Sequence, residues 1–175
     1  MNWRISITAL LFIGAPALAN GELTMSRTSA PVDDAVNSTS QRNLPGATVD
    51  QMITVTNPVG NVTALISTVE ITDKIPTTVR FRVSDLNTGD GPVEFVNGTA
   101  LVVPLLSSGL AYSYKGLNDP TDGLSFSLDN VDYTYQPQDR GGGYDPLVRY
   151  VRVKLTGVRF LNLGSFRLRY RVKLP

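Results

Sequence analysis

The chain ends in a segment in which apolar and basic residues alternate strictly, from Phe166 to Leu174. Alternation with a period of two is typical of a half-buried antiparallel strand, because successive side chains point to opposite faces of a sheet. The apolar face is expected to meet a core. The other face of this predicted strand carries Arg167, Arg169, Arg171 and Lys173.

Short apolar or alternating runs also fill the chain from residue 48 onward. Gly, Pro, Asn and Asp stand in most of the gaps, and these residues favour turns. No stretch shows a helical period with caps, so we expect an all-β domain of roughly eight to ten short strands in two antiparallel sheets. The other strands are predicted at residues 52–58, 62–71, 78–84, 93–96, 100–103, 110–115, 124–128, 131–135 and 148–155.

The segment before this domain, residues 20–47, is rich in Ser, Thr, Asn, Asp and Pro and can bury little apolar surface. A weak alternation over Glu22–Thr28 allows two interpretations. It can be a short edge strand, or it can stay disordered until another sheet pairs with it. We therefore predict an extended or disordered arm that can be donated as a strand to a neighbouring subunit.

The first residues resemble a signal peptide. Arg4 precedes the apolar run Ile5–Gly14, and the small-residue site Ala17–Ala19 follows. The apolar run is too short to span a bilayer, so we expect cleavage after Ala19. A buried helix or an uncleaved anchor fits less well, because the next residues are polar. The predicted divisions are a signal peptide at 1–19, the arm at 20–47 and a sandwich at 48–175.

Two residue types are missing from the chain, cysteine and histidine. An exported chain without disulfides must be held by core packing, which favours a bacterial periplasm or cell exterior. The lack of histidine excludes histidine triads and histidine-metal sites. We expect a secreted or cell-surface protein of a bacterial envelope that is not an enzyme and has no transmembrane segment once processed.

The charge is unevenly distributed along the chain. Residues 20–146 hold 7 basic and 15 acidic side chains, whereas residues 147–175 hold 8 basic and no acidic ones. A nearly neutral total does not fit a dedicated nucleic-acid partner. The candidate contacts for an anion or another subunit are Arg152, Lys154, Arg167, Arg169, Arg171 and Lys173. Acidic residues on flanking strands are an equally simple partner for these cations.

Two strand-ending motifs carry a resemblance to a known family. Val55-Thr-Asn-Pro58 and Ile71-Thr-Asp-Lys-Ile-Pro76 are similar to the signature of the domain of unknown function eleven, an immunoglobulin-like sandwich of bacterial and archaeal surface proteins. Segments 123–135 and 143–152 resemble its second half, so the resemblance spans about residues 48–174. It implies a stalk, adhesin or filament building block. The chain departs from the usual family pattern in having a single copy.

Two aspartates in the stretch Asn118–Gly123 are candidate calcium ligands, because Ca²⁺ prefers oxygen donors. These are Asp119 and Asp122. The stretch lacks the ligand spacing of an EF-hand loop, and Asp and Asn next to Pro and Gly also favour turns. We expect no other cofactor. Paired carboxylates of a glycosidase remain conceivable from the sequence, but spacing alone cannot place them.

Taken together, these features predict a non-catalytic structural protein that assembles with copies of itself by strand addition. The product would be an extracellular filament or a cell-surface layer. The alternative is a surface binding module in which the basic C-terminal sheet face holds anionic polysaccharide or extracellular DNA.

Overall fold

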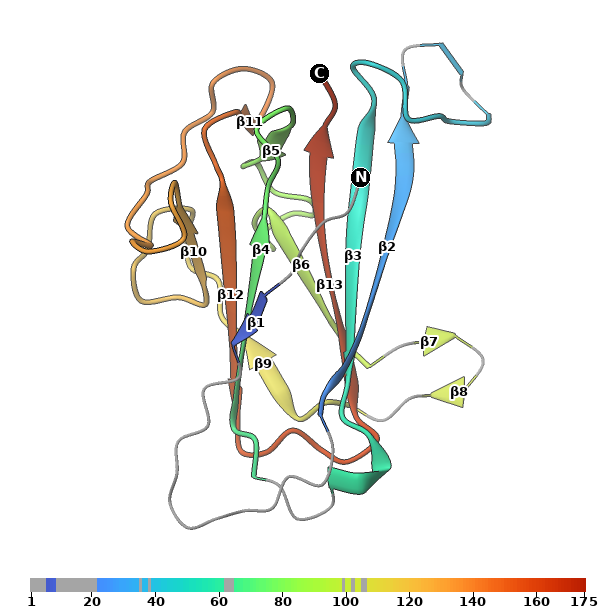
Figure 1. Ribbon diagram of the computed structural model, residues 1–175, viewed down its shortest axis with the longest axis vertical. Coiled ribbons are helices and arrows are strands. Elements are labelled where there is room, and N and C mark those ends of the chain that lie inside the picture. Colours follow the sequence, from blue (N-terminus) through green and yellow to red (C-terminus); the bar gives the residue numbers. More distant parts are fainter. Residues whose placement is uncertain are drawn as a thin grey trace.

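The computed structural model describes residues 6–8, 22–34, 36–37, 39–61, 65–98, 100–101, 103–104 and 107–175. These residues form an all-β, sandwich-like fold built from two antiparallel sheets (Figure 1). The expected fold class is confirmed at this level. Within the described ranges, no helix is long and apolar enough to cross a membrane.

The first sheet has five strands, and β12 pairs the whole length of β4. β9 and β10 also pair β12, and the three-residue strand β1 pairs the outer side of β4. The members are β1 (Ser6–Thr8), β4 (Thr68–Lys74), β9 (Leu110–Tyr112), β10 (Leu124–Ser127) and β12 (Tyr150–Gly157).

The second sheet has six strands and is organised around the last one, β13, which pairs β3, β5 and β6. Its apolar side chains are buried from Phe166 to Val172, as the alternation predicts. The members are β2 (Thr24–Asp33), β3 (Thr48–Thr56), β5 (Arg80–Arg82), β6 (Val93–Asn97), β11 (Tyr144–Asp145) and β13 (Ser165–Lys173).

One apolar core lies between the two sheets. Phe81 on β5 meets Phe126 on β10 edge to face, with ring centroids 5.7 Å apart, and it also contacts Tyr170 on β13 at 5.5 Å. Such aromatic pairs add packing energy beyond the area that they bury. They join strands of both sheets, so the core fixes the two sheets face to face.

Three predicted strands differ from the structure. The one predicted at 62–71 begins only at Thr68 within the described residues and runs on to Lys74. Residues 131–135 are not a strand, because the Asp129 carboxylate accepts hydrogen bonds from the backbone N–H groups of Val131 and Asp132 and holds a turn there. Only Tyr135 forms an isolated bridge, to Phe126. The predicted strand at 100–103 is a small hairpin of β7 (Ala100–Leu101) and β8 (Val103–Pro104), separate from both large sheets.

The segment predicted as an arm contains β2, which forms an edge of the second sheet by pairing β3 (Figure 1). Of the two interpretations of Glu22–Thr28, the edge strand is therefore the one that the structure contains. The predicted signal peptide, residues 1–19, lies outside the described residues except for β1. The connection from β3 to β4 begins with a short 3-10 helix, Val59–Asn61.

Candidate functional site

The six candidate cations lie on the outer faces of two different sheets. Arg152 and Lys154 belong to β12 of the first sheet, whereas the other four belong to β13 of the second. Because the two sheets pack face to face, their outer faces point in opposite directions. The structure therefore brings the cations together as two separate groups and not as one basic surface.

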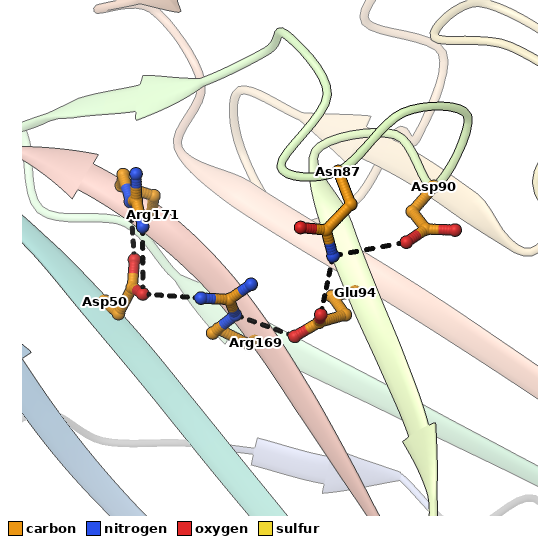
Figure 2. A network of polar contacts seen from close by, with 6 residues as sticks. All are labelled: Asp50, Asn87, Asp90, Glu94, Arg169 and Arg171. Carbon is orange, nitrogen blue, oxygen red and sulfur yellow. Dashed lines mark hydrogen bonds and ion pairs between the residues drawn. The ribbon is translucent and has the colours of Figure 1, made fainter.

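Two cations of the β13 group, Arg169 and Arg171, are neutralised by carboxylates on the neighbouring strands (Figure 2). Asp50 on β3 lies opposite Arg171 in the strand register and binds it through two bonds, Nε to Oδ1 at 2.6 Å and Nη2 to Oδ2 at 3.1 Å. The same Oδ2 accepts a bond of 3.0 Å from Nη1 of Arg169. The hydrogen bond with Asp50 raises the pKa of Arg171 above its ordinary value.

Arg169 also binds a second carboxylate, on the other side of β13. Glu94 on β6 lies opposite Arg169 in the register, and its Oε2 accepts a bond of 2.7 Å from Nε of Arg169. Asn87 in the preceding loop donates to Oε1 of Glu94 at 2.6 Å and to Asp90 at 3.3 Å. These are cross-strand pairs of opposite charge. Acidic residues on flanking strands are thus the partners of these cations, as one of the two sequence interpretations allows.

The cations on β12 have partners of their own. Nε of Arg152 lies 3.2 Å from Oε1 of Glu70 on β4, and its guanidinium lies 3.3 Å from the ring centroid of Tyr133. A guanidinium over an aromatic face is a favourable cation–π arrangement. Lys154 is exposed and lies opposite Glu70 in the register. Within the described part of the chain, Lys154, Arg167 and Lys173 form no ion pair.

The candidate calcium ligands Asp119 and Asp122 hold the backbone of their own turn. Asp119 Oδ1 accepts bonds from the N–H and hydroxyl of Thr121, which lower its pKa. Asp122 accepts bonds from the N–H groups of Lys115 and Leu124. No group of three or more acidic side chains placed to hold a metal occurs among the described residues. The calcium site stays a prediction.

The sequence interpretation missed a polar cluster between the two sheets. Arg27 on β2 points inward, and its Nη1 lies 3.0 Å from Oδ1 of Asp73 on β4. Its Nη2 donates to Tyr170 Oη at 2.8 Å and to Gln51 Oε1 at 3.0 Å. Ser29 donates to the same Gln51 oxygen at 2.7 Å. The cluster thus ties the edge strand β2 to β3 and β13 and to the opposite sheet.

Burial shapes the electrostatics of this cluster. The Asp73 side chain is 2% exposed and that of Arg27 is 16% exposed. Burial raises the pKa of Asp73, although the Arg27 charge and the Tyr170 hydroxyl act in the opposite direction. Burial also raises the pKa of Tyr170, which stays a neutral donor to Asp73 Oδ2. The cluster is a buried charge pair whose remaining oxygens are hydrogen-bonded.

The alternation of apolar and polar residues places two members of this cluster, Arg27 and Asp73, at inward-facing positions. On β2, Arg27 falls in the same phase as Met25, which packs against the core; on β4, Asp73 falls in the phase of Val69 and Ile71. Two opposite charges on inward-facing positions must be paired, because an isolated buried charge is very costly. Arg27 lies in the segment predicted as an arm, so the sequence prediction does not place its charge inside the domain.

Comparison with known proteins assigns no function: no family model, no curated protein and no solved structure matches the chain. Function must therefore be inferred from the chain's own residues.

Proposed function

We propose that the protein is a non-catalytic structural subunit, exported to the cell surface, that joins copies of itself into an extracellular filament or a surface layer. Assembly proceeds by exchange of β2 between neighbouring subunits. In this proposal the sandwich is immunoglobulin-like, and residues 1–19 are a signal peptide that is removed on export. These points extend the resemblance to surface modules of the domain of unknown function eleven.

The observation that supports exchange is the position of β2. It is an edge strand whose sheet partner is β3, from Thr24 opposite Thr56 to Asp33 opposite Thr48. Residues 34–47 connect the two strands, which is a long connection for an antiparallel pair. If this connection extends, the β2 of one subunit can form the same ladder with the β3 of the next. Strand addition of this kind supplies main-chain hydrogen bonds without a new fold.

The inter-sheet cluster would make the exchange selective. A donated strand brings Arg27, and the receiving subunit supplies Asp73, Tyr170 and Gln51. A strand that enters one residue out of register would place Arg27 on the outer face and leave Asp73 buried without its charge partner. Only a matching strand satisfies both requirements, so a subunit favours another copy of itself.

The alternative of an anion-binding module is supported less well by the same contacts. Arg169 and Arg171 are bound to Asp50 and Glu94, and Arg152 is paired with Glu70. An anionic polymer would have to displace these carboxylates before it could use the guanidinium groups. The exposed Lys154 and Lys173 lie on opposite faces and do not form one binding surface.

Disulfide locking tests strand exchange, because the chain contains no cysteine. Thr28 and Met52 lie directly opposite each other on β2 and β3, so the double variant Thr28→Cys/Met52→Cys can bind β2 to its own sheet. We expect the oxidised variant to remain monomeric and the reduced variant to assemble, as seen by light scattering and negative-stain electron microscopy. The matched control is Thr68→Cys/Thr156→Cys, which joins β4 to β12 and should not block assembly.

The disulfide is formed in dilute monomer and shown to lie within one chain, because an exchanged β2 also places Thr28 opposite Met52 of the neighbouring subunit. Assembly of this oxidised Thr28→Cys/Met52→Cys variant would reject exchange of β2. A monomeric wild-type protein at high concentration would reject self-assembly altogether. The lock is a sharper test than deletion of residues 20–47, because deletion also removes Arg27 and leaves Asp73 without its charge partner in the monomer.

A further inference from the structure

Three connections meet at one end of the sandwich, at the bottom of Figure 1. Their described residues are 57–61 and 65–67 between β3 and β4, 98, 100–101, 103–104 and 107–109 between β6 and β9, and 158–164 between β12 and β13. The strand registers place them together, since Ser165 lies opposite Thr56 and Gly157 lies opposite Leu110. We call these three connections the apolar end.

Large apolar side chains are exposed at the apolar end. Val158 is 94% exposed, Leu65 is 72% exposed and Val59 is 66% exposed. Leu161 and Leu163 are also exposed. Single exposed apolar residues are ordinary, but a group of them on neighbouring connections marks an interaction surface.

The middle connection adds a separate apolar hairpin. Residues 100–106 read Ala-Leu-Val-Val-Pro-Leu-Leu, without a polar side chain. β7 and β8 within this stretch pair with each other and with neither large sheet, and Figure 1 shows them set off to one side. A lone two-stranded hairpin is marginally stable in water. A run of apolar residues in a hairpin apart from both sheets indicates a binding role.

Charge is distributed in the opposite way. In the three connections of the apolar end, Arg159 is the single charged residue, and Glu22 enters from the same side just before β2. The other end of the sandwich is strongly charged. Its connections and strand ends carry Asp34, Arg42, Lys74, Asp139, Arg140, Asp145, Arg149 and Lys173. The apolar end is therefore poor in charge and the other end is rich in it, with Val36 and Leu147 exposed among those charged residues.

We propose that the apolar end inserts into the surface of a lipid bilayer, with the strands standing away from the membrane. The near-neutral charge of this end fits zwitterionic lipid, because the binding would come from buried apolar area and not from attraction to anionic headgroups. This inference does not depend on the exchange of β2.

A second copy of the chain fits the apolar end less well. Stacking the apolar end of one copy on the other end of the next would bury charged side chains against apolar ones, which is costly. Contact between two apolar ends avoids that cost, but the exposed apolar side chains of the two copies would have to fit together. A fluid bilayer accepts side chains from separate connections without such a fit.

Site-specific fluorescence can test the insertion, again because the chain lacks cysteine. An environment-sensitive dye is attached to Val158→Cys and, as matched control, to Val131→Cys, a valine that is 83% exposed in the 128–135 segment. The full chain is mixed with phosphatidylcholine vesicles, with and without brominated lipid as quencher. We expect a blue shift and quenching at position 158 and no change at position 131.

The affinity is tested with the unlabelled variants Val158→Asp and Val131→Asp. We expect vesicle binding to weaken roughly tenfold for Val158→Asp and to stay unchanged for Val131→Asp. Two results would overturn the proposal: equal signals at both positions, or vesicle binding that Val158→Asp leaves intact. Another part of the chain, such as residues 1–19, would then suffice for binding. A blue shift at position 158 that grows with protein concentration without lipid would instead assign this end to a second copy.

Discussion

Arg27 on the edge strand β2 and Asp73 on β4 join the two sheets, with Nη1 3.0 Å from Oδ1. Both side chains occupy positions that the alternation assigns to the core, and both are largely removed from water. At this edge a charged pair takes the place of apolar packing. The pair therefore adds to the β3 ladder in holding β2.

Removal of one partner should be costly. In Arg27→Met the Asp73 carboxylate loses its ion pair while it stays buried, and loss of one partner of a buried pair costs about 3–5 kcal/mol. Because Arg27 retains some exposure, we expect the free energy of unfolding to fall by about 3 kcal/mol. The measurement is urea denaturation followed by circular dichroism.

The double variant Arg27→Met/Asp73→Leu is the control for this prediction. It removes both charges and should recover most of the loss, because an apolar pair of similar volume replaces a buried ion pair at little cost. A single variant as stable as the wild type, or a double variant as unstable as the single one, would contradict the assigned role of the pair.

Acid stability should depend on Asp34, the first residue after β2. Its carboxylate accepts bonds from the backbone N–H groups of Val36, Asn37 and Arg42, at 2.8, 2.5 and 2.6 Å. Burial raises the pKa of Asp34, but these bonds outweigh it and lower the pKa from its ordinary value of 3.8 to about 2. The ionised carboxylate thus organises the connection between β2 and β3.

The sign of the pH effect follows from this shift. The folded pKa lies below the unfolded one, so the Asp34 contribution is fully present above pH 3.8 and is lost as the pH falls through about 2. Asp34→Asn should be less stable than the wild type above this window, and the difference should shrink within it. Thermal unfolding at several pH values measures it, and a constant difference would contradict the prediction.

The alternation of β13 was readable from the sequence because its environment repeats along the strand. Every second residue meets the core, and two of the intervening basic residues, Arg169 and Arg171, meet carboxylates of β3 and β6. The partners that bind these basic side chains could not be predicted in the same way. Whether Asp50 or an external anion binds Arg171 depends on which strand lies beside β13, and that pairing is set by contacts distant in the chain.

Turns were harder to separate from strands. Residues 131–135 alternate like a strand, but Asp129 and a left-handed Asn130, with a φ of 71°, form a tight turn before them. The hydrogen bonds of the Asp129 side chain outweigh the β propensity of Val131 and Tyr133. The carboxylates proposed as calcium ligands follow the same principle, since Asp119 and Asp122 also bind the nearby backbone.

Close backbone contact should make Gly157 intolerant of a side chain. A Cβ atom there would lie 2.2 Å from the carbonyl oxygen of Gly109, a backbone atom that cannot rotate away. We expect Gly157→Ala to lower the free energy of unfolding by about 1–3 kcal/mol through overpacking between β9 and β12. Gly116→Ala is the matched control, because nothing lies within 4 Å of its Cβ position, and it should be neutral or slightly stabilising. Equal effects of the two changes in urea denaturation would contradict this contact.

Removal of the carboxylates that bind Arg169 and Arg171 should create an anion-binding surface on β13, which we expect the wild type to lack. In Asp50→Asn/Glu94→Gln, Arg169 and Arg171 keep their positions beside β3 and β6 but lose their counter-charges. We expect this variant to elute from an anionic resin such as heparin at clearly higher salt than the wild type, since unpaired guanidinium groups attract anions.

The matched control for this prediction is Asp119→Asn/Asp132→Asn, which removes the same charge from exposed turns. It separates the effect of net charge from that of the freed arginines. If the wild type is retained as strongly as Asp50→Asn/Glu94→Gln, the carboxylates do not mask the cations, and anion binding becomes the better account of the face. If only the variant is retained, Asp50 and Glu94 mask the β13 arginines in the wild type, and these arginines serve the sheet itself.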